Sequence, residues 1–375
     1  LALIKTFAIF SMGYLARPFG GFILSSYADF YGRKNIFLLT TLLMSIATIS
    51  IGLLPTYKQA GVISPLLLLL LRFIQGVSLG SEIPGATAIT VEHGDKGRFG
   101  RLCGILWSGT SLGAILSVAM LSVLTSLYSF DEIVNSNIWR VPFLFGGILT
   151  VICYYVRTNI NETPEFLECK NELVTRNIFA AFKNNKLNLL LGFSIIIFFA
   201  VLVIINIYFP VFISSNYQHS LPEIYSALVW SKVVSFLSIL LFGFISDYYC
   251  KYKAMRYALI VGLLLIWPMH LLLSTNHFGL LISFFILYQT VIALYFTSAL
   301  PILSRLFPTK IRCASIAIIY NFAFMITSTI PSICSLKIFN QSVGIVLITL
   351  IIISALISLW ANIKLFNQTQ GKYAN

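Results

Sequence analysis

Long apolar stretches, separated by short polar segments, occupy most of this chain. A helix needs about 20 apolar residues to cross a bilayer, and on that scale the pattern predicts eleven membrane-spanning helices. We place them at residues 3–27, 36–54, 65–90, 101–127, 141–156, 188–213, 222–246, 254–274, 277–302, 313–335 and 342–366. The expected fold class is therefore an all-α membrane protein.

Composition supports this class, and charge placement orients it. Hydrophobic residues make up 58% of the chain and charged residues 10%, whereas soluble domains carry about 25% charged residues. The formal net charge is +13, but most Lys and Arg lie in alternate loops and in the C-terminal tail. The positive-inside rule makes that side cytoplasmic. We therefore expect a multi-pass inner-membrane protein, with residues 157–187 and the C-terminus in the cytoplasm, and no nucleic-acid partner.

One short pattern occurs twice, each time where an apolar stretch ends. Asp29 is followed by Arg33 and Lys34, and Asp247 is followed by Lys251. Such a recurrence predicts two homologous halves, as in transporters built from repeats. The expected division is an N-terminal bundle of five spans at 1–156, a cytoplasmic linker at 157–187, a C-terminal bundle of six spans at 188–366 and a cytoplasmic tail at 367–375.

Aligning the two hairpins leaves the first half one helix short, so we expect this chain to lack a first helix. The linker has two interpretations, a plain solvated segment or one with an amphipathic helix lying on the membrane.

Six motifs, in order along the chain, carry a family resemblance. They are Arg17-Pro18-x-Gly20-Gly21, Asp29-x-x-Gly32-Arg33-Lys34, Arg72-x-x-Gln75-Gly76-x-Ser78-x-Gly80-x-Glu82, Trp139-Arg140-x-Pro142-Phe143, Glu162-Thr163-Pro164, and Leu300-Pro301 with Phe307-Pro308-Thr309-x-x-Arg312. With them the chain resembles the major facilitator superfamily, and within it the metabolite:proton symporter branch that includes proline/betaine transporters.

The resemblance implies a fold of two six-helix bundles, with eleven helices present here, acting as a monomer. It also implies proton-coupled symport of a small carboxylate-bearing or zwitterionic solute, either a proline/betaine-like osmolyte or an organic acid. The alternative is a non-transporting membrane protein, a sensor or an inactive remnant of the same fold.

The two hairpins suggest a conformational gate. An Asp at a helix C-terminus meets carbonyl dipoles that repel an anion, so Asp29 needs a donor from elsewhere. The resemblance implies that Asp29 caps the helix beginning near Arg312, and that Arg33 pairs with Glu92. The predicted gate residues are Asp29, Arg33, Glu92, Asp247 and Arg312. The alternative is that Asp29, Arg33 and Glu92 only solvate a tight loop.

Charged side chains inside the spans point to function, because each costs about 2.5–3.5 kcal/mol to insert. Glu82 is the expected proton carrier, since removal from water favours its neutral form. The alternative for Glu82 is a structural ion pair with Arg17. Because Arg17, Arg72 and Lys232 outnumber Glu82, we expect a solute that carries a carboxylate. The predicted substrate-binding residues are Arg17, Gln75, Ser78, Asn206, Tyr208, Lys232, Tyr288 and Asn321.

Metal and cofactor chemistry has no motif here. The chain contains no CxxC or HExxH spacing, and its four His are scattered. The six Cys are expected to be free thiols. A GxxxxGK[ST] loop is also missing, which argues against an ATP-driven pump. We therefore expect no metal site, no cofactor and no enzymatic activity.

Overall fold

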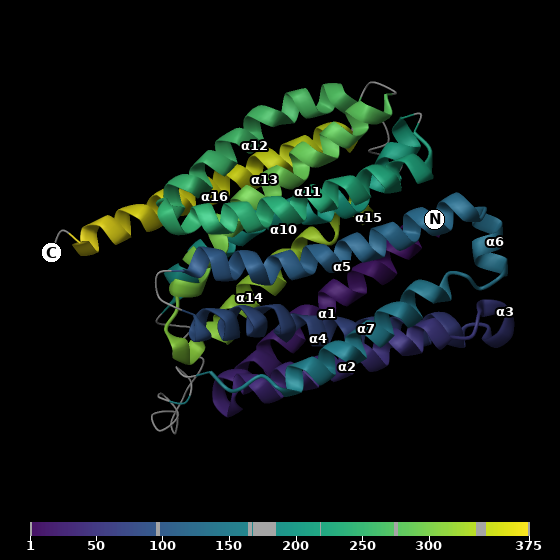
Figure 1. Cartoon of the computed structure of the whole chain (residues 1–375), viewed down its shortest axis with the longest axis horizontal. Coiled ribbons are helices and arrows are strands. Elements are labelled where there is room, and N and C mark those ends of the chain that lie inside the picture. Colours follow the sequence, from purple (N-terminus) through teal and green to yellow (C-terminus); the bar gives the residue numbers. More distant parts are fainter. Residues whose placement is uncertain are drawn as a thin grey trace. The chain divides into compact units, whose positions relative to one another are not determined.

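A computed structural model describes residues 2–94, 98–163, 167, 185–217, 219–273, 277–334 and 343–373. Throughout these residues the regular structure is helical, and no strand occurs among them (Figure 1). Eight of the described helices are long and apolar enough to cross a membrane. The expected all-α membrane fold is confirmed.

The helices form two compact units, and each contains helices from both sides of the 157–187 segment. The first unit comprises Leu1–His93, Phe130–Leu189 and Phe307–Leu336. In it α1 packs along α4 and α14, and α2 packs against α4 and α7. Its helices are α1 (Ala2–Tyr31), α2 (Arg33–Leu53), α3 (Tyr57–Ala60), α4 (Ile63–His93), α6 (Phe130–Asn135), α7 (Arg140–Thr158), α14 (Thr309–Thr327) and α15 (Ile330–Cys334).

The second unit comprises Gly94–Ser129, Leu190–Leu306 and Lys337–Asn375. In it α11 packs against α5 and α13, and α12 packs against α13 and α16. Its helices are α5 (Phe99–Leu127), most of α10 (Lys186–Asn216), α11 (Leu221–Tyr248), α12 (Lys251–Leu273), α13 (Phe278–Arg305) and α16 (Val343–Tyr373). The division into two halves at the linker, which rests on the sequence repeat, stays a prediction.

Ten predicted spans each correspond to one observed helix, but the tenth along the chain, 313–335, does not. It is α14 followed by the short α15, so the prediction of one continuous helix is wrong. At the junction Thr327 donates to the Ala323 carbonyl at 2.9 Å and Ser328 to the Met325 carbonyl at 2.7 Å. Pro331, just beyond, has no N–H with which to continue the helix.

The boundaries of the linker and the tail also differ from the prediction. Arg157, which we placed at the start of the linker, lies in the last turn of α7, and α16 continues to Tyr373 through most of the predicted tail. The amphipathic helix considered for the linker falls on residues 164–184, of which only Leu167 is described.

Small residues let α1 and α4 approach each other closely. A Cβ added to Gly80 would lie 2.7 Å from the backbone nitrogen of Gly21, and one added to Gly76 would lie 2.7 Å from the Cβ of Ala16. A side chain at either position would force the two helices apart. Glycines at this spacing are typical of close helix pairs in membranes.

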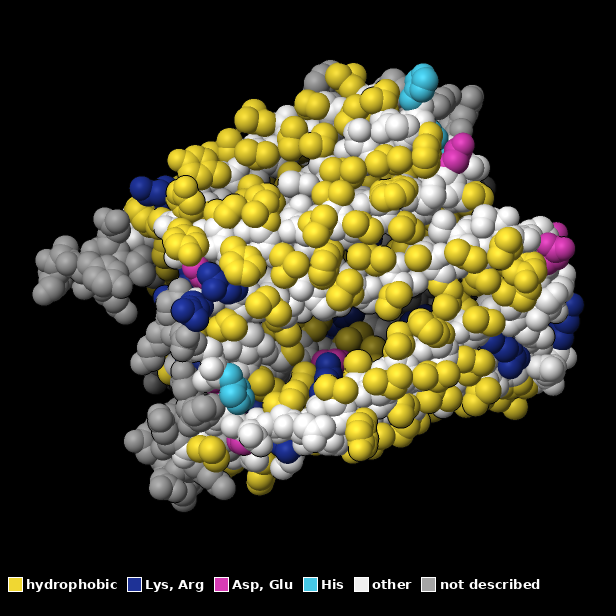
Figure 2. Space-filling view, viewed as in Figure 1, with side chains coloured by type: hydrophobic (Ala, Val, Ile, Leu, Met, Phe, Trp, Pro, Cys, Tyr) yellow, Lys and Arg dark blue, Asp and Glu magenta, His cyan; other side chains and the backbone are white. Residues whose placement is uncertain are grey.

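The molecular surface is rich in exposed apolar side chains. Tyr155, Leu264 and Ile345 are 75%, 70% and 68% exposed. On the face drawn in Figure 2, hydrophobic side chains run along the exposed sides of the helices, and charged side chains are few. Patches of this extent would be a liability in water but suit contact with lipid.

Candidate functional site

A buried cluster of charges surrounds Glu92 at the end of α4. The Arg33 Nε and Nη2 atoms lie 2.6 Å and 2.8 Å from its two carboxylate oxygens, and Arg312 Nη1 lies 3.1 Å from Oε1. The Thr163 hydroxyl donates to Oε2 at 2.8 Å. Glu92 is only 5% exposed. The pair of Arg33 and Glu92 expected from the resemblance is therefore present, and Arg312 joins it.

Asp29 is bound to the beginning of α14. Its Oδ2 accepts the backbone N–H of Ala314 at 2.9 Å, and its Oδ1 lies 3.6 Å from Arg33 Nη2. The amides near a helix N-terminus carry partial positive charge, which favours a carboxylate there. Asp29 is 4% exposed and Arg33 2%. The alternative in which these side chains only solvate a tight loop is wrong.

Glu162 is a further member of this cluster. Its two oxygens accept the backbone N–H groups of Arg33 at 3.0 Å and Lys34 at 3.2 Å, which are the first two residues of α2. Its motif was recognised in the sequence, but no role was assigned to it. The role is evident only from the tertiary structure, in which the segment after α7 lies beside the start of α2.

Asp247 performs the matching task in the second unit. Its Oδ1 accepts the Gly100 N–H at 2.6 Å and its Oδ2 accepts the Arg101 N–H at 3.0 Å. These amides belong to the first turn of α5, and backbone N–H groups in a first turn have no partner within their own helix. A Cβ on Gly100 would lie 2.8 Å from both Asp247 Oδ1 and the Gly243 carbonyl. Gly100 is therefore the residue that lets the carboxylate reach both amides.

Glu82 forms an ion pair with Arg157. The Glu82 Oε1 to Arg157 Nη1 distance is 2.8 Å, and the two side chains are 20% and 21% exposed. Arg157 also donates to the Thr41 hydroxyl, and its guanidinium lies 3.9 Å from the centre of the Phe37 ring. The alternative that paired Glu82 with Arg17 is wrong. Arg157 was missed because it lies one residue beyond the predicted end of its span.

Gln75 and Ser78 link α4 to α2. Gln75 Nε2 donates to the Thr48 hydroxyl at 2.8 Å, and the Ser78 hydroxyl donates to the Thr40 carbonyl at 2.5 Å. Ser78 is completely buried. Arg72 Nη1 donates to Gln75 Oε1 at 3.2 Å. Gln75 and Ser78 thus bind the neighbouring helix α2.

Arg17 lies against aromatic rings. Its guanidinium is 4.0 Å from the centre of the Tyr14 ring and 5.7 Å from that of Phe324, and Tyr14 and Phe324 are stacked. Its Nε atom is buried and has no hydrogen-bond partner among the described residues. Among the residues that the structure describes, no carboxylate forms an ion pair with it.

Lys232 is the corresponding cation of the second unit. It lies in the middle of α11, between the buried Ser231 and Ser235, and is partly exposed. Within the described ranges it also forms no ion pair.

The other polar residues expected to bind solute have partners within their own unit. Asn206 Oδ1 accepts from Gln289 at 3.0 Å, and the Tyr288 hydroxyl donates to the Leu202 carbonyl at 2.7 Å. The ring of Tyr208, which is 4% exposed, lies 6.2 Å from that of Phe212.

Asn321 of α14 contacts α4 at Gly80, where α1 and α4 approach each other closely. Its Nδ2 donates to the Gly80 carbonyl at 2.7 Å, so α14 is bonded to α4. Its Oδ1 atom is buried, and no hydrogen-bond partner for it occurs in the part of the chain that the structure describes.

Among the described residues, no group of three or more His, Cys, Asp or Glu side chains is arranged to hold a metal ion. Cys103, Cys153, Cys250, Cys313 and Cys334 are free. The sixth, Cys169, lies outside the part of the chain that the structure describes.

Comparison with known proteins places this arrangement in a family. Residues 5–332 match the family described as the Major Facilitator Superfamily. The citrate-proton symporter of Klebsiella pneumoniae is 26% identical over 325 residues, which cover 86% of this chain and 73% of that protein. A Staphylococcus aureus protein, named provisionally as a proline/betaine transporter, is 39% identical over 46% of this chain and 36% of its own length.

A solved structure supports the same fold. The proton:xylose symporter XylE, bound to 6-bromo-6-deoxy-D-glucose, superposes with a TM-score of 0.73 at 13% identity, covering 97% of this chain and 86% of XylE. At this identity the likeness concerns the fold alone. The family match, in contrast, extends over most of the chain. The protein is a multi-pass membrane protein that belongs to the Major Facilitator Superfamily of transporters.

Proposed function

We propose that this protein is a proton-coupled symporter that carries a small carboxylate-bearing or zwitterionic solute across the inner membrane. The observation that carries the proposal is the pair of cations, Arg17 in α1 and Lys232 in α11, that have no carboxylate partner among the described residues. A charge within a membrane span is costly and is usually paired. A solute carboxylate would supply the missing partner.

The names of the relatives support this solute class. One relative is a citrate-proton symporter, and another is named provisionally for proline and betaine. Citrate, proline and betaine all carry a carboxylate. We propose that Arg17 and Lys232 are substrate-binding residues, and that the other predicted residues, Gln75, Ser78, Asn206, Tyr208, Tyr288 and Asn321, orient the helices of their own unit for binding.

Glu82 is the proposed proton carrier, and Arg157 is its counter-ion. Both side chains are about one-fifth exposed, so a proton can reach the carboxylate. Protonation would neutralise Glu82 and remove its attraction for Arg157, which loosens the link between α4 and α7. Release of the proton would restore the pair. Protonation of Glu82 would thus change the contact between α4 and α7.

The carboxylates that bind amide groups at helix N-termini are the proposed gate. Asp29 with Arg33, Glu92 and Arg312, and separately Asp247, hold helix ends through contacts that a transport cycle must break and re-form. Because residues 157–187 are rich in basic side chains, we propose that this segment and the C-terminus lie in the cytoplasm.

Uptake by membrane vesicles tests the proposal. Radiolabelled citrate, proline and betaine are offered to vesicles that contain the protein, with and without an inward proton gradient. We expect one of them to accumulate only with the gradient. Lys232→Met and Arg17→Gln should raise KM for that solute, while Lys58→Gln, at an exposed position of the short helix α3, serves as the matched control.

Two outcomes would count against the proposal. Uptake of a neutral sugar in place of all three carboxylates would refute the solute class. Gradient-driven accumulation by Glu82→Gln equal to that of the parent would place the proton site elsewhere.

A further inference from the structure

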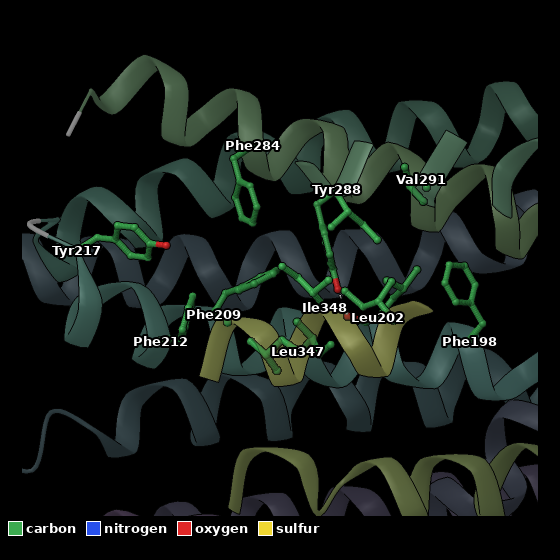
Figure 3. A pocket seen from close by; sticks show the side chains of 15 residues that line it. Phe198, Leu202, Phe209, Phe212, Tyr217, Phe284, Tyr288, Val291, Leu347 and Ile348 are labelled. Atoms are coloured by element: carbon green, nitrogen blue, oxygen red, sulfur yellow. Dashed lines mark hydrogen bonds between the residues drawn. The ribbon is translucent and has the colours of Figure 1, made fainter. Parts of the chain in front are cut away.

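An elongated apolar pocket lies inside the second unit. Its walls come from α10, α12, α13 and α16, and Figure 3 shows the lining from Tyr217 at one end to Phe198 at the other. The lining residues are Phe198, Leu202, Ile205, Phe209, Phe212, Tyr217, Gly262, Ile266, Phe284, Tyr288, Val291, Gly344, Leu347, Ile348 and Ile351.

The shape of the pocket follows from the stripe that α10 contributes. The lining side chains of α10 recur every three or four residues from Phe198 to Phe212, so they share one helix face. At a rise of 1.5 Å per residue this stripe is about 21 Å long. That length exceeds half of the about 30 Å hydrocarbon core of a bilayer. The pocket therefore suits a long, thin ligand aligned with the helices.

The chemistry of the lining is apolar except at one end. Among the described lining residues, only Tyr288 and Tyr217 have polar side-chain atoms, and the Tyr288 hydroxyl is already bonded to the Leu202 carbonyl at 2.7 Å. Tyr217 lies just beyond the end of α10, and its hydroxyl points towards the other lining side chains (Figure 3). Partial burial raises the pKa of the Tyr217 phenol above its ordinary value. The phenol thus remains a neutral hydrogen-bond donor at the polar end.

The pocket reaches the surface at α12 and α16, because its lining residues Ile266, Ile348 and Ile351 are themselves partly exposed. The outward faces of the same two helices are apolar, with Leu264 of α12 70% exposed and Ile345 of α16 68% exposed. In a membrane protein such exposed side chains contact lipid. The nearest molecule able to enter the pocket is therefore a lipid of the bilayer.

We infer that this pocket binds one acyl chain of a bilayer phospholipid, with the headgroup side at Tyr217 and the methyl end towards Phe198. The bound chain fills space between α10 and its neighbours that no side chain of the described lining occupies. Arg17, Lys232 and Glu82 do not line this pocket, whereas Tyr288, one of the predicted substrate-binding residues, does.

Photolabelling with a phospholipid that carries a diazirine near the end of one acyl chain tests the inference. The whole protein is reconstituted in vesicles that contain this lipid and irradiated, and the labelled peptides are identified by mass spectrometry. We expect label on the Phe198 end of the lining. A diazirine placed close to the ester should shift the label to the Tyr217 end.

Two glycine variants provide the comparison. A Cβ at Gly344 would lie 4.0 Å from the Phe212 ring, so Gly344→Leu fills the pocket, whereas a Cβ at Gly279 meets nothing within 4 Å. Gly344→Leu should lose the label on the lining, and Gly279→Leu should keep it. Ile348→Trp is a second filling variant, used if Gly344→Leu is not produced in folded form.

The inference is overturned if the label on the lining survives both filling variants. It is also overturned if label appears only on outward residues such as Leu264. Labelling by a free diazirine fatty acid but not by the phospholipid would assign the pocket to a different ligand and equally reject the proposed lipid.

Discussion

The replacement Glu92→Gln tests whether the buried charge cluster holds the first unit in one conformation. Glu92 is 5% exposed and contacts Arg33 at 2.6 Å and 2.8 Å and Arg312 at 3.1 Å. Gln keeps the size of the side chain but not its charge. Arg33, which is 2% exposed, then loses its contacts with a charged Glu92, while the Asp29 carboxylate stays at 3.6 Å.

The magnitude follows from the cost of leaving a buried cation without its principal partner. Removing one member of a buried ion pair costs about 3–5 kcal/mol. Because Asp29 remains nearby, we take the lower end of that range, about 3 kcal/mol. At about 1.4 kcal/mol per factor of ten, the equilibrium should shift by roughly two powers of ten towards an open arrangement.

Cys313 reports the opening directly. Its thiol is completely buried and packs with Ala28 and Ala88 beside Asp29. In a chain whose other cysteines are replaced by Ser, we expect Glu92→Gln to raise the rate of Cys313 alkylation by a maleimide about 100-fold, in proportion to the open population. Asp131→Asn, which neutralises an exposed carboxylate of α6, is the matched control.

An unchanged alkylation rate, with normal abundance of the variant in the membrane, would refute the reasoning. A fall in abundance without faster alkylation would also contradict it, since Glu92 would then stabilise the fold and hold no movable contact.

Three further predictions concern the gate, the packing and the orientation. Asp29→Asn should abolish or sharply slow solute uptake while the amount of protein in the membrane stays near that of the parent, because the charge acts on a conformational contact. Uptake assays measure the first quantity and immunoblotting the second, and normal uptake by a variant that is degraded would contradict the prediction. Gly100→Ala should lower the free energy of unfolding by about 1–3 kcal/mol, since the added Cβ would lie 2.8 Å from Asp247 Oδ1. Thermal unfolding of this variant is compared with that of Gly109→Ala, whose Cβ meets nothing within 4 Å, and equal stability of the two variants would reject the argument. Cys169 should resist an impermeant thiol reagent in intact cells and react in inverted vesicles, and labelling in intact cells would reverse the orientation.

Local pattern was enough to predict most of the helices. Ten of the eleven predicted spans correspond to single helices, because length and apolarity are set by the thickness of the bilayer and not by the neighbours of each helix. The prediction of one continuous helix at 313–335 is wrong because α14 ends at Thr327, where hydroxyl side chains bond to backbone carbonyls and Pro331 follows. Such an interruption is local, but hydroxyl groups are frequent in uninterrupted membrane helices too, so their presence alone did not reveal it.

The candidate site was predictable to a lesser extent. The resemblance correctly paired Arg33 with Glu92 and directed Asp29 to α14. It did not reveal that Glu162 binds the first amides of α2 or that Asp247 binds those of α5. Both contacts join segments more than a hundred residues apart, and no periodicity within either segment encodes its partner.

The sequence by itself determined which residues enter the membrane, which loops are basic and which charges need a partner, since each of these follows from the cost of polar groups in hydrocarbon. Only the tertiary structure decided who the partners are. Glu82 pairs with Arg157 and not with Arg17, and Ser78 turns towards α2. The physical reason is that a partner is chosen by helix rotation and close packing across the bundle, where a shift of one residue turns a side chain by about 100°.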